Sequence, residues 1–477
     1  QYMTLIQHEM KPFYPKFSAS IAEQSPSRRE QGRCALVEFR RDARQITSFR
    51  SSADLNECLR DTSPPAYHED GFIPRRRLFI LEDLPCNHIL ALGSQLRIPP
   101  NFFAGHWDDP ASPTFNHRDP FQRCMLPQFR IRYGMSTRVE IDATCNPSGL
   151  TGTYAFDTNV HRYIHFYDRK GLLYDEPRIH HIMSFWTTDP TTDGSWDAVL
   201  LVDPPPQHRV ICLATQSFVN LRHSLLDDDS MPKRFLNPQL NSPNELPKDS
   251  STWSAAHSMP RYKSMFDDAL QSYRTCQTGA HVTHDPLTAV EYPRKLVMST
   301  LLAFVRRRYL NTVNVHKTQG PHILRHNYLS SFSNSSISCW NNEFFDFILD
   351  SCAAMKEFSR EIDENMTALG LESAQHIVPA WEVDGWKSIR DMTRAVKEMA
   401  ETLATNYLQY VTIQEAHASN GSAKSLSRIT VLTMLFIPLS TIASIFSMSG
   451  DFLPGQTKSW IFWVIVIPVL AMLACVY

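Results

Sequence analysis

The chain has 477 residues, a formal net charge of −2 and hydrophobic residues at 43% of its positions. This length can bury one or two cores, and the near-neutral charge gives no general basis for binding nucleic acid. The ten cysteines form no CxxC pair, which argues against a zinc ribbon or a disulfide framework and favours reduced thiols. Gly-rich phosphate loops, nucleophile elbows and HExxH motifs are missing from the sequence, so we do not expect an enzyme.

The first 220 residues indicate a mixed cytosolic domain. Residues 1–30 are polar and contain Pro12, Pro15 and Pro26, which predicts a loose N-terminal lead-in. An α/β domain is expected over residues 31–220, where apolar strands alternate at first with short helices. The strands are CALVEFR and RRRLFILEDL, and the helices are SADLNECLRD, CNHILALGSQL and PPNFFAGHW.

Residues 129–215 are rich in β-branched and aromatic runs that are separated by turn residues. Their order predicts a mostly antiparallel sheet with helices covering at least one face. The fold class expected for the soluble part is therefore α+β. Residues 221–260 change to Asp, Ser, Pro and Asn, which is typical of a disordered insertion. Residues 261–385 then form the helical part of the cytosolic domain, with long amphipathic helices over 286–310 and 342–369.

A stalk helix is predicted over residues 386–428. Its apolar residues fall at spacings of three and four, the coiled-coil seam of a helix that packs on partner helices: Ile389, Met392, Val396, Met399, Leu403, Tyr407, Tyr410 and Ile413. Gly421 is the weak point, at a cost of about 1 kcal/mol in a helix interior. The alternative is a surface helix, a loop near HASNGSAKS and a separate membrane span.

Two membrane spans are predicted at the C-terminal end. Residues 429–448 carry no charge, and twenty helical residues reach about 30 Å, the thickness of a hydrocarbon core. After a short loop at 449–459, residues 460–477 form a second uncharged run. The chain would cross the bilayer and return, as a multi-pass integral membrane protein. Lys424 and Arg428 before the first span favour a cytosolic N-terminal domain; which membrane it occupies is not encoded in these features.

This layout resembles the CorA family of magnesium channels and transporters, together with the related ZntB zinc transporters. TMLFIPLSTIASIFSMSG is similar to the first span of that family, and NFFAGHW and DAVLLVDPP are similar to its divergent fungal branch. The resemblance implies a homopentamer in a lipid bilayer, with a pore lined by the first span. It implies Mg²⁺ or another divalent cation as the transported or regulatory ion, with no other cofactor.

The sequence departs from that family at the selectivity filter. The family has Gly-Met-Asn where this chain has Ser447, Met448 and Ser449. A serine hydroxyl is shorter than an asparagine amide, so the ring of five would be wider and would discriminate less among cations. Two functions therefore stay open: divalent cation transport, or a non-conducting signalling or scaffold protein that has lost the filter.

Hydroxyl residues form a row on the first span. At 100° per residue, Thr433, Ser440, Ser444 and Ser447 lie within a stripe about 60° wide, which would face the water if five helices enclose a pore. The alternative is that these residues allow close helix packing, or bond back to their own helix. Asp451 would form a carboxylate ring at the pore mouth, or is an ordinary loop residue.

Other polar clusters have plainer explanations. His161 and His165 are four residues apart, and His180 and His181 are adjacent, yet no further ligand completes a metal site at a recognisable spacing. Five basic residues lie on a predicted helix, where a solvated face is expected rather than a phosphate site: Arg294, Lys295, Arg306, Arg307 and Arg308.

Overall fold

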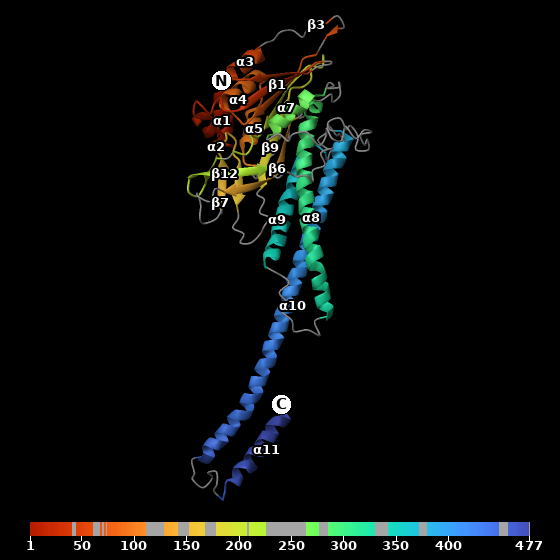
Figure 1. The fold of residues 1–477 in the computed structure, drawn as a ribbon. Coiled ribbons are helices and arrows are strands. Elements are labelled where there is room, and N and C mark those ends of the chain that lie inside the picture. The colour runs from red at the N-terminus through yellow and green to blue at the C-terminus, as the bar shows by residue number, and fades with distance from the viewer. Residues whose placement is uncertain are drawn as a thin grey trace. The chain divides into compact units, whose positions relative to one another are not determined.

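The computed structural model describes residues 1–40, 44–60, 67–68, 71–72, 74–110, 128–141, 152–166, 178–207, 209–225, 264–275, 285–329, 342–371, 379–447 and 457–476. These form two compact units (Figure 1). The first comprises Gln1–Gln319 and Ile337–Ala400, and the second comprises Gly320–Ser336 and Glu401–Tyr477.

The N-terminal residues require a correction, because they are not a loose lead-in. They form helices α1 (Tyr2–Met10) and α2 (Pro15–Glu23). Pro15 starts α2 at a position where its missing N–H costs nothing. Ile6, Phe17 and Ile21 are fully buried, so their apolar side chains dock this segment on the domain. The prolines that suggested a loop are helix starts and connections.

A ten-stranded sheet forms the centre of the first unit. Its order is β2-β1-β5-β10-β9-β6-β12-β11-β7-β8, and every described pairing is antiparallel except that of β5 with β10. The strands are β1 (Arg33–Phe39), β2 (Arg44–Phe49), β5 (Arg76–Glu82), β6 (Phe129–Ile141), β7 (Gly152–Phe156), β8 (Tyr163–Phe166), β9 (Arg178–Thr187), β10 (Trp196–Val202), β11 (Arg209–Cys212) and β12 (Phe218–Leu225). A separate pair is formed by β3 (Tyr67–His68) and β4 (Gly71–Phe72). The prediction of a mostly antiparallel sheet is confirmed.

The sheet continues past the predicted domain boundary at residue 220. β12 pairs with β11 over Phe218–Asn220 and with β6 over Leu221–Leu225, so the first five residues of the predicted insertion, 221–225, are strand. Backbone pairing with β6 holds this segment despite its polar composition. The rest of the predicted insertion, residues 226–260, lies outside the described residues.

Helices cover both faces of the sheet, which explains the continuous apolar runs of its central strands. Successive residues of β1, β5 and β10 alternate between two cores. One core contains Ala35, Ile80 and Leu200, and the other contains Leu36 and Phe79. The second core is covered by α1, α2, α3 (Ser52–Arg60), α4 (Cys86–Leu96) and α5 (Pro100–Trp107).

The first core is covered by the helices that follow the sheet in the chain (Figure 1). They are α7 (Met265–Thr275), the 3-10 helix η2 (Pro286–Val290), α8 (Glu291–Leu329), α9 (Asn342–Ala368) and the first part of α10 (Ala380–Ser447). The prediction of a solvated basic face fails at Arg294. Arg294 is 1% exposed and forms a buried ion pair with Glu382 at the start of α10.

The side-chain amide of Asn365 on α9 forms hydrogen bonds with the backbone of strand β6. Its Oδ1 accepts a hydrogen bond from the backbone N–H of Arg132 at 2.7 Å, and its Nδ2 donates to the carbonyl of the same residue at 2.7 Å. β12 pairs with β6 only from Thr137 to Ile141. The amide of Asn365 therefore bonds to the backbone of β6 where β12 has no described pairing.

Helix α10 runs without interruption from Ala380 to Ser447, through Gly421 and Pro438. It begins six residues before the stalk start predicted at Trp386, because the carbonyl of Pro379 accepts the N–H of Glu382 and starts the first turn. Ile389 and Val396 of the predicted seam are buried in the core of the first unit. Leu403 and Tyr407 are buried as well, whereas Ile413 is 42% exposed. Helix α11 (Trp460–Val476) follows.

Candidate functional site

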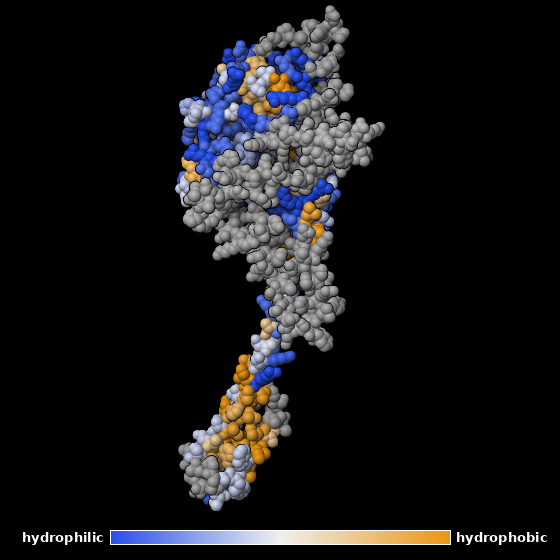
Figure 2. Space-filling view, viewed as in Figure 1, coloured by the Kyte–Doolittle hydropathy of each residue, from blue (hydrophilic) through white to orange (hydrophobic). Residues whose placement is uncertain are grey.

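The C-terminal part of α10 exposes large apolar side chains over most of its surface. Nearly all its large side chains are exposed, among them Ile429 at 60%, Phe436 at 57% and Ile445 at 61%. Of the described helices, only α10 is long and apolar enough to cross a membrane, and α11 has a shorter apolar run over Trp460–Met472. Figure 2 shows this surface as a continuous hydrophobic area. Leaving it in water would cost about 25 cal/mol per Å², so its proper surroundings are lipid or other apolar helices.

Helices α10 and α11 touch within this apolar part. The rings of Phe446 and Phe462 meet edge to face, with centroids 5.9 Å apart, and Val466 is fully buried. Edge-to-face contacts of this kind are favourable beyond the area they bury. The two apolar helices therefore form a packed pair within the second unit.

Three of the four predicted pore-lining hydroxyls bond back to their own helix. Thr433 Oγ1 donates to the carbonyl of Ile429 at 2.7 Å, and Ser440 Oγ donates to the carbonyl of Ile437 at 2.9 Å. Ser447 Oγ donates to the carbonyl of Ser444 at 3.1 Å. Each hydroxyl proton is thus satisfied without water, as a membrane interior requires.

This bonding decides what the hydroxyl row can offer to a ligand. A hydroxyl group has one proton and two acceptor lone pairs. Once the proton is given to the helix, the oxygen can only accept. The side chains of Thr433, Ser440 and Ser447 are all exposed, so their three hydroxyl oxygens present acceptors along the helix. Such a row suits a cation or its bound waters and does not suit an anion.

The remaining members of the predicted filter are not part of the described structure. Met448, Ser449 and Asp451 lie outside the described residues, and Ser447 is the last residue of α10. The filter and the pore mouth thus remain sequence predictions.

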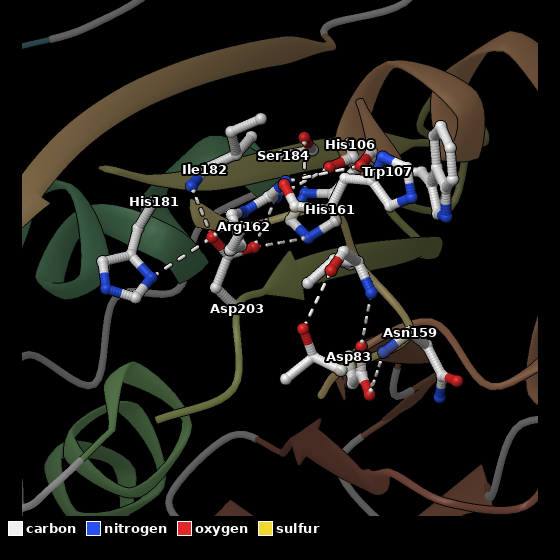
Figure 3. Close-up of polar contacts among 12 residues, drawn as sticks. Asp83, His106, Trp107, Asn159, His161, Arg162, His181, Ile182, Ser184 and Asp203 are labelled. Carbon is white, nitrogen blue, oxygen red and sulfur yellow. Dashed lines mark hydrogen bonds and ion pairs between the residues drawn. The ribbon is translucent and has the colours of Figure 1, made fainter. Parts of the chain in front are cut away.

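A second polar site lies inside the first unit and is centred on Asp203 (Figure 3). Arg162 Nε and Nη2 donate to the two carboxylate oxygens of Asp203 at 2.5 and 2.7 Å. The N–H of Ile182 and Nδ1 of His181 also approach Oδ2, at 2.9 and 3.2 Å. His106 Nε2 lies 3.2 Å from Oδ1. All these groups are buried, and this bonding keeps the pKa of Asp203 well below its usual range, against the effect of burial.

Arg162 connects this carboxylate to the end of α5. It donates from Nη2 to the carbonyl of His106 at 2.7 Å, and from Nη1 to the carbonyl of Asp108 at 2.8 Å. Burial lowers the pKa of His106 to about 4, so its imidazole is neutral at physiological pH. The network thus holds one charged pair that is satisfied by backbone groups and imidazole rings, which is the arrangement of a structural support.

The four histidines considered from the sequence lie on β8 and β9 or just before β8. His161 stacks on Trp107, with ring centroids 3.9 Å apart, and His165 Nδ1 lies 2.9 Å from Thr153 Oγ1. His180 and His181 are neighbours on β9 and point to opposite faces. Within the part of the chain that the structure describes, no group of three His, Cys, Asp or Glu residues could hold a metal ion.

Sequence reasoning missed the network of Arg162 and Asp203. The two residues are 41 positions apart, and neither lies in a recognisable motif. One signal was present, since Asp203 directly follows the apolar run of β10. A carboxylate at the end of a strand buried on both faces needs a partner.

These observations define the class of protein as one with a folded α+β unit and apolar C-terminal helices suited to a bilayer. Residues 382–477 match the family model described as CorA-like Mg2+ transporter protein. The C-terminal part of the chain is therefore a CorA-like domain, as the sequence resemblance implied, and members of that family are integral membrane proteins.

Two further comparisons were made. The structure is similar to "The complete structure of CorA magnesium transporter from Methanocaldococcus jannaschii", with 10% sequence identity and a TM-score of 0.38, over 93% of this chain and 96% of that chain. No curated protein matches the sequence.

Proposed function

We propose that the protein mediates the transport of divalent metal cations, magnesium first, through a homopentameric pore lined by α10. The observation that carries the proposal is the row of hydroxyl oxygens on an apolar helix of a CorA-like domain. Mg²⁺ releases its waters reluctantly, and those waters are hydrogen-bond donors. Acceptor oxygens at Thr433, Ser440 and Ser447, together with the exposed hydroxyl of Ser444 in the same row, would match a hydrated ion without stripping it.

Self-association is needed because one row of hydroxyls cannot enclose a pore. The exposed apolar side chains of α10 supply the surface for it. Ile413 and Leu408 are 42% and 56% exposed, and both lie before the charge-free segment. An exposed apolar patch of this kind marks an interaction surface. A pentamer in mild detergent, measured by native mass, supports the proposal, and a monomer or dimer under every condition contradicts it.

The transport test uses the purified protein in liposomes, with Mg²⁺, Zn²⁺, Co²⁺ and Ni²⁺ compared under an imposed gradient. We expect saturable uptake of divalent cations that protein-free liposomes do not show. Retention of the metals outside the liposomes, with correctly inserted pentamers, would refute the proposal.

A second function is favoured by one specific observation. Ser447, Met448 and Ser449 stand where the resembling family has Gly-Met-Asn, so the filter could be lost. The protein would then be a membrane-anchored scaffold or signalling protein with the same architecture. The liposome experiment separates the two functions, because the scaffold assembles but carries no ion. Neither reading requires an enzymatic activity.

A further inference from the structure

A cavity of about 580 Å³ lies within the first unit, away from the membrane helices. It is bounded by α5, the first residues of β6, the second half of α9 and Lys397 of α10. Pockets of 300 to 1,000 Å³ are the usual size for small-molecule sites. Tyr14 and Phe102 contribute aromatic walls, and polar side chains from β6 and α9 converge on the same space.

Arg130 is a cation of this cavity that has no described ion pair, although the carboxylate of Asp108 lies in the same lining. Its Nε atom is buried and has no hydrogen-bond partner. Among the described residues, the guanidinium of Arg130 makes neither a hydrogen bond nor an ion pair. The neighbouring arginines differ, since Arg132 is bound to Glu364 and to the carbonyl of Pro110, and Arg162 is bound to Asp203. A buried donor without a partner is costly, and the Nε of Arg130 is such a donor at the wall of a cavity that could admit an anion.

The fold holds Arg130 in this place. It alternates along β6 with Phe129 and Ile131, which point into the sheet core, so Arg130 and Arg132 share the opposite face. A side chain at Gly105 of α5 would place its Cβ 3.9 Å from Arg130 Cδ. The backbone of α5 therefore lies close beside the arginine, and the guanidinium is positioned by a strand and a helix.

The cavity carries more positive than negative charge. Its described lining includes five basic side chains (Arg130, Arg132, Lys356, Arg360 and Lys397) and three acidic ones (Asp108, Asp363 and Glu364). Of the acidic groups, Glu364 already faces both Arg132 and Arg360. The lining thus has a net charge of about +2, and Arg130 has no described ion pair.

We propose that this cavity binds a small organic phosphate, with the phosphate group on Arg130. A guanidinium presents two parallel N–H donors to a phosphate. A phosphate monoester carries a charge of about −1.5 to −2 at neutral pH, which balances the excess of the lining. The volume exceeds that of a phosphate ion, so the organic part of the ligand would lie against Tyr14 and Phe102.

The electrostatics of Arg130 agree with this role. Burial, together with the nearby charges of Arg162 and Arg132, lowers the pKa of Arg130 to about 10. The side chain stays protonated at neutral pH, but in unfavourable surroundings. A bound anion would relieve both the desolvation and the repulsion, so ligand binding would stabilise the folded unit by mass action.

The test is calorimetric titration of the full-length protein in detergent, free of divalent metals. The probes are adenosine 5′-monophosphate, ribose 5-phosphate and inorganic phosphate, with adenosine as the neutral control. We expect saturable binding of at least one ester, at least tenfold tighter than inorganic phosphate, and no heat with adenosine. Equal affinity for the ester and for inorganic phosphate would refute the proposal that the ligand has an organic part. Absence of binding for every phosphate probe would refute the proposed site altogether.

Variants identify the residue that binds. Arg130→Gln should weaken ester binding at least tenfold, and the matched change Arg394→Gln, at an exposed position of α10 outside the cavity lining, should leave it unchanged. Lys356→Gln, also at an exposed position, should weaken binding several-fold, and it provides a second test if Arg130→Gln does not fold. Unchanged affinity in both Arg130→Gln and Lys356→Gln would contradict the proposal. These readouts are independent of transport, so a failed flux assay would not decide them.

Discussion

Arg294 on α8 and Glu382 at the start of α10 form a fully buried ion pair. Nε of Arg294 lies 2.9 Å from Oε1 and 3.1 Å from Oε2, and Nη2 lies 3.0 Å from Oε2. Arg294 also donates from Nη1 to the carbonyl of Leu287 at 2.7 Å. This one side chain therefore joins η2, α8 and α10 within the core of the first unit.

Removing one partner of this pair should destabilise the first unit strongly. Glu382→Gln leaves the guanidinium of Arg294 buried and uncompensated, which costs about 3 to 5 kcal/mol. Thermal or denaturant unfolding of the purified protein measures this loss. Lys295 and Glu291 form a partly exposed pair one turn apart on α8, and Glu291→Gln should cost no more than about 0.5 kcal/mol. Equal effects of the two changes would contradict the role assigned to Arg294.

Asp83 should make stability depend on pH. Burial raises the pKa of Asp83 to about 7, compared with about 3.9 for an exposed aspartate. Between these values the folded chain keeps a proton that the unfolded chain has released. The contribution of Asp83 to the free energy of unfolding therefore falls as the pH rises from about 4 to about 7, and is constant above that.

The variant Asp83→Asn removes this titration. Asn tolerates the left-handed backbone of this residue, whose φ is 62°, and retains one acceptor for the N–H groups of Asn159 and Val160. We expect the unfolding midpoint of the variant, relative to that of the parent protein, to be higher at pH 7 than at pH 4. The same change at the exposed Asp384 tests for a general effect of losing a carboxylate. A pH-independent difference for Asp83→Asn would rule out its titration.

Ser444→Leu should abolish ion flux. Ser444 lies near the centre of the hydroxyl row, and five isobutyl groups at that level would fill and dewet a narrow pore. Thr441→Leu introduces the same side chain about 60° away from Ser444 around the helix, outside the hydroxyl row, and should leave most of the flux intact. Liposome uptake, normalised to inserted pentamer, measures both variants. Full activity of Ser444→Leu would place the pore on another face of α10.

Ser449→Asn should increase selectivity for magnesium. The longer amide would narrow the constriction predicted at Ser449 and restore the amide ring of the resembling family. We expect uptake to persist, with the ratio of Mg²⁺ to Co²⁺ or Ni²⁺ uptake raised several-fold. Ser459→Asn makes the same exchange just before α11 and should not change that ratio. An unaltered ratio for Ser449→Asn would mean that Ser449 does not select the ion.

The sequence predicted the fold best where burial leaves a continuous or periodic pattern. β1, β5 and β10 are apolar on both faces, and α10 is long enough to show its period. The two N-terminal helices were missed because Pro12 and Pro15 signal a loop as readily as a helix start. The parallel pairing of β5 with β10 joins residues about 120 positions apart. A local sequence pattern cannot predict which distant strands pair.

The candidate sites likewise differ in how much of each could be predicted from the sequence. The hydroxyl row was predictable because four residues on one helix obey a fixed angular step. The bonds of Thr433 and Ser440 back to their helix were one of the two alternatives that the spacing allowed. The cavity at Arg130 was not predicted, because α5, β6 and α9 come together only in the folded chain. Its one local signal is the pair Arg130 and Arg132 in an apolar strand, since residues two apart face the same side.

The contact between Asn365 and the backbone of Arg132 has a consequence for solubility. A strand with unpaired N–H and C=O groups is a template on which another chain can add. The side-chain amide of Asn365 has the same donor and acceptor as a peptide group, so it occupies the place that an incoming strand would take. It carries no neighbouring peptide groups and cannot propagate a ladder. α9 thereby occupies the position on this part of β6 at which the strand of a second molecule could otherwise pair.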